Sequence, residues 1–329
     1  MADSRRSIVA LTVGDDSVAS SRIRVASVLR VASNAGWRTS RLIAHGHRLW
    51  PASLLSRVLV EAPDVVLLQK VAPPGWFVTA LRRRGTRIVF ECDDAIHLGY
   101  PSQRPDEARR TSRRLSRLLP VCERVVVTND LLADDFRALG AQDVEVFPGP
   151  APRVGPKPAS RGARTGLVWV GSPSTYESVR TEVYPALDLL TDRAMSLAVV
   201  GAAVNRTAGR VREMVWSPEA ENSELEAALV GLAPQVDSEW SRRKAFYKVF
   251  EYLAHDVIPV VPRLPAVQTL LGEDLDLIAS VVDGHSPADW ARAIDVAIRR
   301  VVDEAWIGAR DRVFERWSAP RLAATVLEA

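Results

Sequence analysis

Two lysines and a glutamate near residue 250 have the types and the spacing to hold a charged ligand. Lys244, Lys248 and Glu251 are spaced i, i+4 and i+7, which places them on one helical face. Ammonium groups in the first turns of a helix favour a phosphate or diphosphate, because the helix dipole and the terminal N–H groups add to their charge. A carboxylate one turn deeper could accept hydrogen bonds from a ribose diol. The alternative is a solvated surface face with a weak ion pair.

A second group of candidates follows a predicted strand in the first half of the chain. Asp93 and Asp94 come directly after a strand expected over 88–91, and His97 lies three residues further on. Ligands of open α/β sheets bind at the carboxyl ends of the strands, so these side chains could orient substrate hydroxyl groups, with Asp94 as the catalytic candidate. The alternatives are a strand-end turn with an Asx cap and a structural histidine.

Two arginines follow the first predicted strand, at 8–13. Arg22 and Arg24 lie on the loop after this strand, where a helix expected over 23–35 begins, and their guanidinium groups could bind a phosphate of the donor or the acceptor. The alternative is a solvated helix start.

Lysine is rare in this chain. Only four of the 43 basic residues are lysines, namely Lys70, Lys157, Lys244 and Lys248. A lysine retained against such a bias could do something that arginine cannot, because an ammonium group is a compact point charge.

The elements that must position these residues alternate between strands and helices. This alternation predicts two doubly wound parallel sheets. We expect a linker over 148–165, which contains five prolines and three glycines. The predicted domains are 1–155, 156–310 and a helical C-terminal segment, 311–329. The predicted strands are 8–13, 41–44, 65–69, 88–91, 125–128, 144–147, 167–170, 197–200, 230–232, 257–261 and 277–282.

The composition is that of a globular protein. The 329 residues are 47% hydrophobic and 25% charged, and no apolar run is long enough to span a bilayer. Two cysteines, Cys92 and Cys122, lie in apolar runs and are expected to be buried thiols. Five scattered histidines and two distant cysteines give no metal-ligand spacing. We expect a cytoplasmic protein without a bound metal.

The charge is distributed unevenly. Residues 1–155 contain 23 basic and 16 acidic residues, a net +7, and the remainder contains 20 and 24, a net −4. The basic half could meet an anionic acceptor or a membrane surface, or be ordinary solvated charge. The basic residues lack aromatic interleaving, which argues against a nucleic-acid partner.

One long segment carries a family resemblance. Residues 230–261, VGLAPQVDSEWSRRKAFYKVFEYLAHDVIPVV, resemble the donor-binding segment of GT4-like glycosyltransferases, the group 1 enzymes with the two-domain GT-B fold. Those chains show Lys-x-x-x-Lys-x-x-Glu-Tyr followed by an apolar strand. The segments GLVWVGSPST, LAVVG, VFECDDA, SSRIRVASVLRVASNAGW and FERWSAPRLAATVL resemble other parts of the same family.

The resemblance implies a fold and residue roles. Two Rossmann-like domains would face a cleft, and the C-terminal helices would return to the N-terminal domain. Lys248 would neutralise the donor diphosphate, assisted by Lys244, and Glu251 would hold the ribose. The backbone at Gly171 and Ser172 would approach the phosphates. The donor would be a nucleotide sugar, most simply a UDP- or GDP-sugar, and transfer would proceed with retention and without a metal or other cofactor.

The segment departs from the family pattern at two places. Many GT4 enzymes carry Glu-x7-Glu, but the position eight residues before Glu251 is Arg243, and the helix ends in His255-Asp256 where a glycine is frequent. A glycosyltransferase is our first hypothesis, with a saccharide, lipid-linked, protein or natural-product acceptor on the basic domain. The alternatives are a non-catalytic nucleotide-sugar-binding or partner protein and another GT-B enzyme such as a nucleotide-sugar epimerase.

Overall fold

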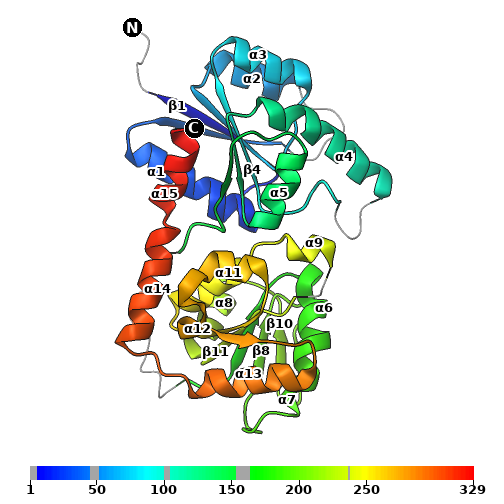
Figure 1. Cartoon of the computed structure of the whole chain (residues 1–329), viewed down its shortest axis with the longest axis vertical. Coiled ribbons are helices and arrows are strands. Elements are labelled where there is room, and N and C mark those ends of the chain that lie inside the picture. Colours follow the sequence, from blue (N-terminus) through cyan, green and yellow to red (C-terminus); the bar gives the residue numbers. More distant parts are fainter. Residues whose placement is uncertain (1–5, 45–51, 100–103, 153–163, 236–237) are drawn as a thin grey trace. The chain divides into compact units, whose positions relative to one another are not determined.

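The computed structural model describes residues 6–44, 52–99, 104–152, 164–235 and 238–329 (Figure 1). The chain divides into two units. The first comprises Met1–Pro150, Arg242–Ala245 and Arg316–Ala329, and the second comprises Ala151–Ser241 and Phe246–Glu315. Most of the predicted linker lies outside the described residues.

The first unit is built on a six-stranded sheet in which every strand is parallel to its neighbours. Its spatial order is β2-β1-β3-β4-β5-β6. Strands β1 and β3 are buried along their whole length, as expected for parallel strands covered on both faces. The bounds are β1 Ser7–Thr12, β2 Arg38–Ile43, β3 Val65–Gln69, β4 Arg87–Cys92, β5 Arg124–Val127 and β6 Val144–Val146.

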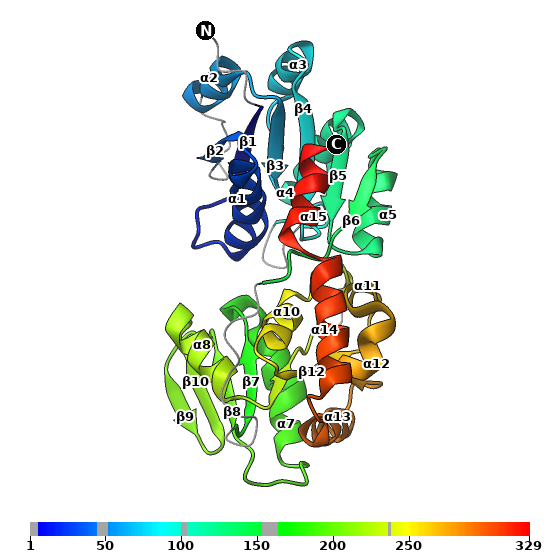
Figure 2. The ribbon, with the colours of Figure 1, turned by 90° about the vertical axis from the view of Figure 1, so that its left-hand side faces the viewer.

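Helices cover both faces of this sheet. On one face α1 packs side by side with the last helix of the chain, α15, around a core that includes Val28 and Val326 (Figure 2). The helices from α2 to α5 lie on the opposite face, as right-handed crossovers require (Figure 1). Their bounds are η1 Ser21–Val25, α1 Ala26–Asn34, α2 Ala52–Glu61, α3 Gly75–Arg83, α4 Pro105–Leu118, η2 Leu119–Val121, α5 Asp130–Ala138 and α15 Ala319–Leu327.

The second unit repeats the plan with a seven-stranded sheet in the order β13-β12-β11-β7-β8-β10-β9. All pairs are parallel except the pair β9–β10 at one edge. The predicted doubly wound architecture is therefore confirmed in both units. The bounds are β7 Leu167–Val170, β8 Leu197–Val200, β9 Arg206–Ala208, β10 Val211–Met214, β11 Val230–Leu232, β12 Ile258–Pro262 and β13 Ser280–Val282.

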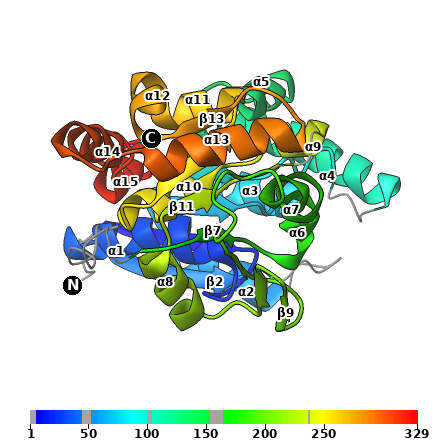
Figure 3. The ribbon, with the colours of Figure 1, turned by 90° about the horizontal axis from the view of Figure 1, so that it is seen from below.

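The second sheet is also covered on both faces, and α13 and α8 lie on opposite sides of β7 and β11 (Figure 3). The turn after β7 begins with η4 Pro173–Thr175, and α9 Glu239–Arg242 precedes α10. The other bounds are α6 Tyr176–Ser178, η5 Val179–Val183, α7 Tyr184–Leu187, α8 Pro218–Ala227, α10 Tyr247–Ala254, α11 Pro265–Leu271, η6 Gly272–Asp274, α12 Leu275–Ile278, α13 Pro287–Arg299 and α14 Glu304–Arg316.

Two predicted elements of the second unit are misplaced. The sequence also predicts a short helix over 225–229, but α8 begins at Pro218, because the Ser217 hydroxyl accepts a hydrogen bond from the Ala220 amide and caps the helix there. The strand expected over 277–282 is too long, since Leu275 and Ile278 are buried on one helical turn and β13 begins only at Ser280.

Both cysteines are buried free thiols, as predicted, and both belong to the first unit. Cys92 ends β4, and its Sγ lies 3.1 Å from the carbonyl oxygen of Asp94. Burial raises the pKa of both thiols.

A buried carboxylate ties the edge of the second sheet to the helices beside it. Glu213 on β10 accepts hydrogen bonds from the hydroxyl groups of Tyr176 and Tyr184, and both of its oxygens lie 3.0 Å from the Arg206 guanidinium. Burial opposes ionisation, but these donors outweigh it and hold the pKa of Glu213 at about 2.

We expect Glu213→Gln to lower the free energy of unfolding by about 1–3 kcal/mol at pH 7. Because the folded-state pKa lies below the ordinary 4.5, the stabilisation is complete above that pH and is lost as the pH falls toward 2. Urea unfolding at pH 7, 5 and 3.5 should therefore show the difference between variant and parent shrinking with acidity.

The matched control is Glu177→Gln, which breaks an exposed glutamate–arginine pair in the same unit. An equal loss in both variants, or a loss for Glu213→Gln that is independent of pH, would contradict the buried-carboxylate assignment.

Candidate functional site

The turn after β7 in the second unit is built around two glycines. The Gly171 amide donates to the Val200 carbonyl, and a Cβ on Gly201 would lie 2.0 Å from the Gly171 oxygen. A Cβ on Gly171 itself would lie 2.3 Å from the Trp169 ring. Both positions therefore exclude a side chain. Ser172 follows as an exposed residue that caps η4.

The start of α10 differs from the prediction at Lys244. The helix begins at Tyr247, and the residue before it, Phe246, is buried with φ −97° and ψ 46°. Lys244 therefore precedes the helix and does not share a face with Lys248, and its contacts group it with the first unit. The predicted common helical face holds for Lys248 and Glu251 only.

Lys248 lies beside the glycine turn. Its Nζ is 4.9 Å from the centroid of the Trp169 ring, a cation–π distance, and Trp169 is fully buried at the end of β7. The spacing of Val249, Phe250 and Leu253 also predicts an apolar face on one side of α10, and the three residues are buried against the sheet. The half-buried Lys248 lies on the other face of α10, and its ammonium group is next to the end of β7.

Tyr252 anchors this helix, a role that sequence reasoning missed. Its hydroxyl donates to the Leu232 carbonyl at 2.7 Å and accepts from the Val170 amide at 3.3 Å, so it joins the ends of β11 and β7. Burial raises the pKa of this phenol. A Cβ on Gly231 would lie 2.4 Å from the Tyr252 ring. The glycine in the sequence Gly231-Leu232-Ala233-Pro234 could have indicated this close packing.

The C-terminal end of α10 explains one departure from the family pattern. Asp256 has φ +55°, a left-handed conformation in which glycine is favoured. The Asp256 carboxylate pairs with Arg310, which holds the chain there. Glu251 is half-buried, and its carbonyl oxygen lies 2.9 Å from His255 Nδ1.

In the first unit, the carboxyl ends of β3 and β4 form a charged cluster. Lys70 follows β3, and its Nζ lies 2.5 Å from Asp93 Oδ1 and 2.6 Å from Asp94 Oδ2. The side chains are 7%, 19% and 11% exposed, respectively. Lys70 has φ +54°, and its amide donates to the Glu91 carbonyl. The rarity of lysine was the signal that pointed to this residue.

The charges in this cluster are coupled. Burial opposes ionisation of Asp93, but Lys70 and Arg24 outweigh it and hold the pKa of Asp93 below its ordinary value. Burial raises the pKa of Glu91, although Arg24 opposes the shift. Because these charged groups are shielded from water, losing one of them would leave its partner as an unpaired buried charge, which is strongly destabilising.

The structure corrects the substrate role predicted for Arg24. Its guanidinium is buried, pairs with Glu91 and donates to the carbonyls of Phe147 and Pro148, each at 3.0 Å. These contacts make it a structural residue that joins β4 to the end of β6. Arg22 is half-buried, and its guanidinium donates to the Asp16 carbonyl at 2.7 Å.

His97 belongs to a second polar chain in the first unit. Its Nε2 lies 2.9 Å from Asp135 Oδ2, and Asp135 also pairs with Arg243, the residue that replaces the first glutamate of the family pattern. Burial lowers the pKa of His97, although Asp135 opposes the shift, so the surroundings favour the neutral imidazole.

Several buried polar atoms at the carboxyl edge of the first sheet lack a hydrogen-bond partner among the described residues. Buried polar atoms are rarely left unpaired, so these sites call for water or for ligand hydroxyl groups. They lie at or just after the ends of β3, β4 and β5 and are Gln69 Nε2, Asp94 Oδ1, His97 Nδ1, Thr128 Oγ1 and Asn129 Nδ2.

Within the described residues, no group of three or more His, Cys, Asp or Glu side chains is placed to hold a metal ion. In the same part of the chain, no helix combines the length and apolar character needed to cross a membrane.

Comparison with known proteins identifies the fold. No protein-family model matches the chain, and no curated protein has a significantly similar sequence. A glycosyltransferase from Rickettsia africae matches with a TM-score of 0.71 and 10% identity, over 99% of this chain and 98% of that one.

Two further structures are similar over nearly their whole length. HepE from Anabaena, in complex with UDP-glucose, matches with a TM-score of 0.69 and 10% identity, over 98% of each chain. The lipopolysaccharide outer core galactosyltransferase WaaB matches with a TM-score of 0.66 and 8% identity, over 98% of this chain and 99% of that one. The chain has the GT-B fold, as predicted.

We expect Lys70→Met to destabilise the first unit by about 2–4 kcal/mol at pH 7, because the largely buried carboxylates of Asp93 and Asp94 lose their positive partner. Without Lys70 the pKa of Asp93 should rise above its unfolded value. The deficit relative to the parent should then be largest at neutral pH and shrink as the pH falls toward 4. Denaturant unfolding across this range measures it.

The double variant Lys70→Met/Asp93→Asn should regain part of the loss, since one of the two unpaired charges is removed. If the double variant is less stable than Lys70→Met alone, charge pairing is not what makes this cluster stabilise the first unit.

Proposed function

We propose that this protein is a nucleotide-sugar-dependent glycosyltransferase of the GT4-like, retaining type. The second unit would bind the donor and the first unit the acceptor. The observation that carries the proposal is the placement of Lys248 beside the glycine turn that ends β7. The lysine supplies positive charge beside a turn whose glycines let Trp169 and the backbone at 171 and 201 pack closely, and we propose that a diphosphate binds to the exposed side of this turn.

The donor site would be completed by Glu251, which follows Lys248 on the same face of α10. Its carboxylate would accept hydrogen bonds from the ribose hydroxyls. Backbone groups at Gly171 and Ser172 would contact the phosphates, and Lys244 would play a smaller part because it lies outside α10. A UDP-sugar is the favoured donor, since a structural neighbour is a UDP-glucose complex.

The acceptor site would lie at the carboxyl edge of the first sheet. The unpartnered atoms there include an acceptor on Asp94 and a donor on Asn129, a mixture that suits a polyhydroxylated ligand. We therefore propose a saccharide acceptor. Asp94, oriented by Lys70, would hold the reacting hydroxyl, and His97 would contact the sugar beside it.

In the reaction, the anomeric carbon exchanges its bond to a diphosphate oxygen for a bond to the acceptor oxygen, and the proton of the acceptor hydroxyl passes to the departing diphosphate. Negative charge grows on the departing diphosphate, and the Lys248 ammonium would stabilise it. Because Lys248 is fixed over Trp169 before the donor arrives, little reorganisation is needed at that step. We propose that this charge stabilisation serves in place of a metal ion, and that activity persists in EDTA.

Lys248→Ala should weaken UDP binding by about 10- to 150-fold, the scale of a lost charge-assisted contact of about 1.5–3 kcal/mol. Isothermal calorimetry measures the Kd, and a thermal-shift series with UDP, GDP, dTDP, ADP and CDP identifies the base.

The matched control is Arg299→Ala, which removes one exposed positive charge from α13 of the same unit. Lys244→Ala should weaken UDP binding less than Lys248→Ala. Unchanged UDP affinity in a folded Lys248→Ala protein would overturn the donor site.

Asp94→Asn should leave the UDP affinity unchanged and lower kcat at least tenfold, about 1.4 kcal/mol of transition-state stabilisation. Asp134→Asn, which changes an exposed carboxylate on α5, is the control. The anomeric configuration of the product, determined by NMR, tests retention.

The same assay separates the proposal from its alternatives. UDP-sugar binding without turnover over a broad panel of saccharides would favour a non-catalytic binding protein. Conversion of the donor to its epimer without an acceptor would instead identify an epimerase.

A further inference from the structure

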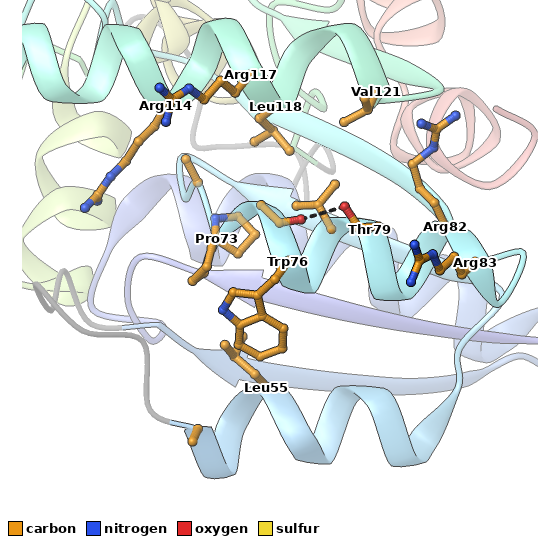
Figure 4. Close-up of a pocket in the computed structure, with 15 residues that line it drawn as sticks. Leu55, Pro73, Trp76, Thr79, Arg82, Arg83, Arg114, Arg117, Leu118 and Val121 are labelled. Carbon is orange, nitrogen blue, oxygen red and sulfur yellow. Dashed lines mark hydrogen bonds between the residues drawn. The ribbon is translucent and has the colours of Figure 1, made fainter.

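A pocket of about 870 Å³ in the first unit is lined by residues other than those of the candidate site, although it includes the segment that follows Lys70. It is formed by α2, by α3 with the segment before it, and by the C-terminal part of α4 (Figure 4). Its floor is apolar and includes Leu55, Val78 and Leu118. Since the residues of the donor and acceptor sites do not line it, this pocket needs an explanation of its own.

Four arginines surround the apolar floor. Arg82 and Arg83 extend from the last turn of α3, and Arg114 and Arg117 extend from α4 (Figure 4). None of the described lining residues is acidic. Among the described residues, no ion pair joins any of these four guanidinium groups to a carboxylate, and all four are exposed. The pocket therefore carries concentrated positive charge that suits an anion.

The apolar side chains of the pocket narrow the class of anion that it suits. Trp76 lies on the wall at the start of α3 and is 58% exposed, an unusual position for so large an apolar side chain (Figure 4). A free inorganic anion would use the arginines and leave the tryptophan and the apolar floor in water. An amphiphile with a phosphate group and a hydrocarbon chain would use both features.

We propose that this pocket binds the phosphate-bearing headgroups of anionic lipids and so docks the first unit on an anionic bilayer surface. The planar guanidinium groups of Arg114 and Arg117 form paired hydrogen bonds with phosphate oxygens. Trp76 lies at the level of the headgroups, where its ring contacts acyl chains and its indole N–H reaches polar groups. The proposal is independent of the donor site, because it uses none of its residues.

Sedimentation of the full-length protein with lipid vesicles tests the proposal. Vesicles of phosphatidylcholine with 30% phosphatidylglycerol should bind the protein at least tenfold more strongly than pure phosphatidylcholine. Each arginine near an anionic surface is worth roughly fivefold in partitioning, so Arg114→Ala/Arg117→Ala should lower the partition coefficient about twenty- to thirtyfold. Trp76→Ala should weaken binding to the same vesicles.

The matched control is Arg30→Ala/Arg38→Ala. It removes the same charge from exposed positions of α1 and β2 that do not line the pocket, and α1 covers the face of the sheet opposite to α3 and α4. This variant should lower partitioning less than threefold. The UDP affinity of both double variants should equal that of the parent, which separates this test from the test of the donor site.

Three results would overturn the proposal. The first is equal binding to both kinds of vesicle, and the second is an equal loss in the control double variant, which would indicate unspecific charge. The third is displacement of the protein from the vesicles by inorganic phosphate or by a short oligonucleotide, added at a concentration of negative charge equal to that of the anionic lipid. These competitors would identify a free-anion or nucleic-acid site instead.

Discussion

Parallel strands that are covered on both faces favour polar side chains at the strand ends, and this constraint shapes the central strands of both sheets. Strands β1, β3, β7 and β8 are buried along their whole length. Charged and hydrogen-bonding groups consequently gather at the strand ends and in the residues that follow them, and the buried Glu91 lies next to the last residue of β4. Lys70, Asp93 and Asp94 lie at such positions in the first unit, as does the Gly171 turn in the second.

The same constraint determines how much could be predicted from the sequence. Continuous apolar runs identify buried strands, so Asp94 and Gly171 could be placed at strand ends from the printed residues alone. The amphipathic pattern likewise placed Lys248 and Glu251 on the polar face of α10. These features depend on local sequence and on rules that hold for every doubly wound sheet.

The predictions that failed depend on contacts between residues distant in sequence. Lys244 is separated from α10 because Phe246 has a non-helical backbone conformation, and periodicity alone cannot reveal that interruption. Arg24 is buried because it pairs with Glu91 on β4 and donates to the carbonyl of Phe147 after β6, and the sequence alone does not show these contacts. Tyr252 was read as part of a motif, but its function depends on two backbone groups 20 and 82 residues away.

The positions of the two cysteines have a practical consequence. Cys92 and Cys122 are the only thiols in the sequence, and both are buried in the first unit with their ionisation suppressed. Alkylating reagents attack thiolates, so these residues react only when the first unit opens. The chain therefore contains its own reporter: the rate of thiol labelling follows the local stability of one unit, while the other unit, which has no cysteine, contributes no signal.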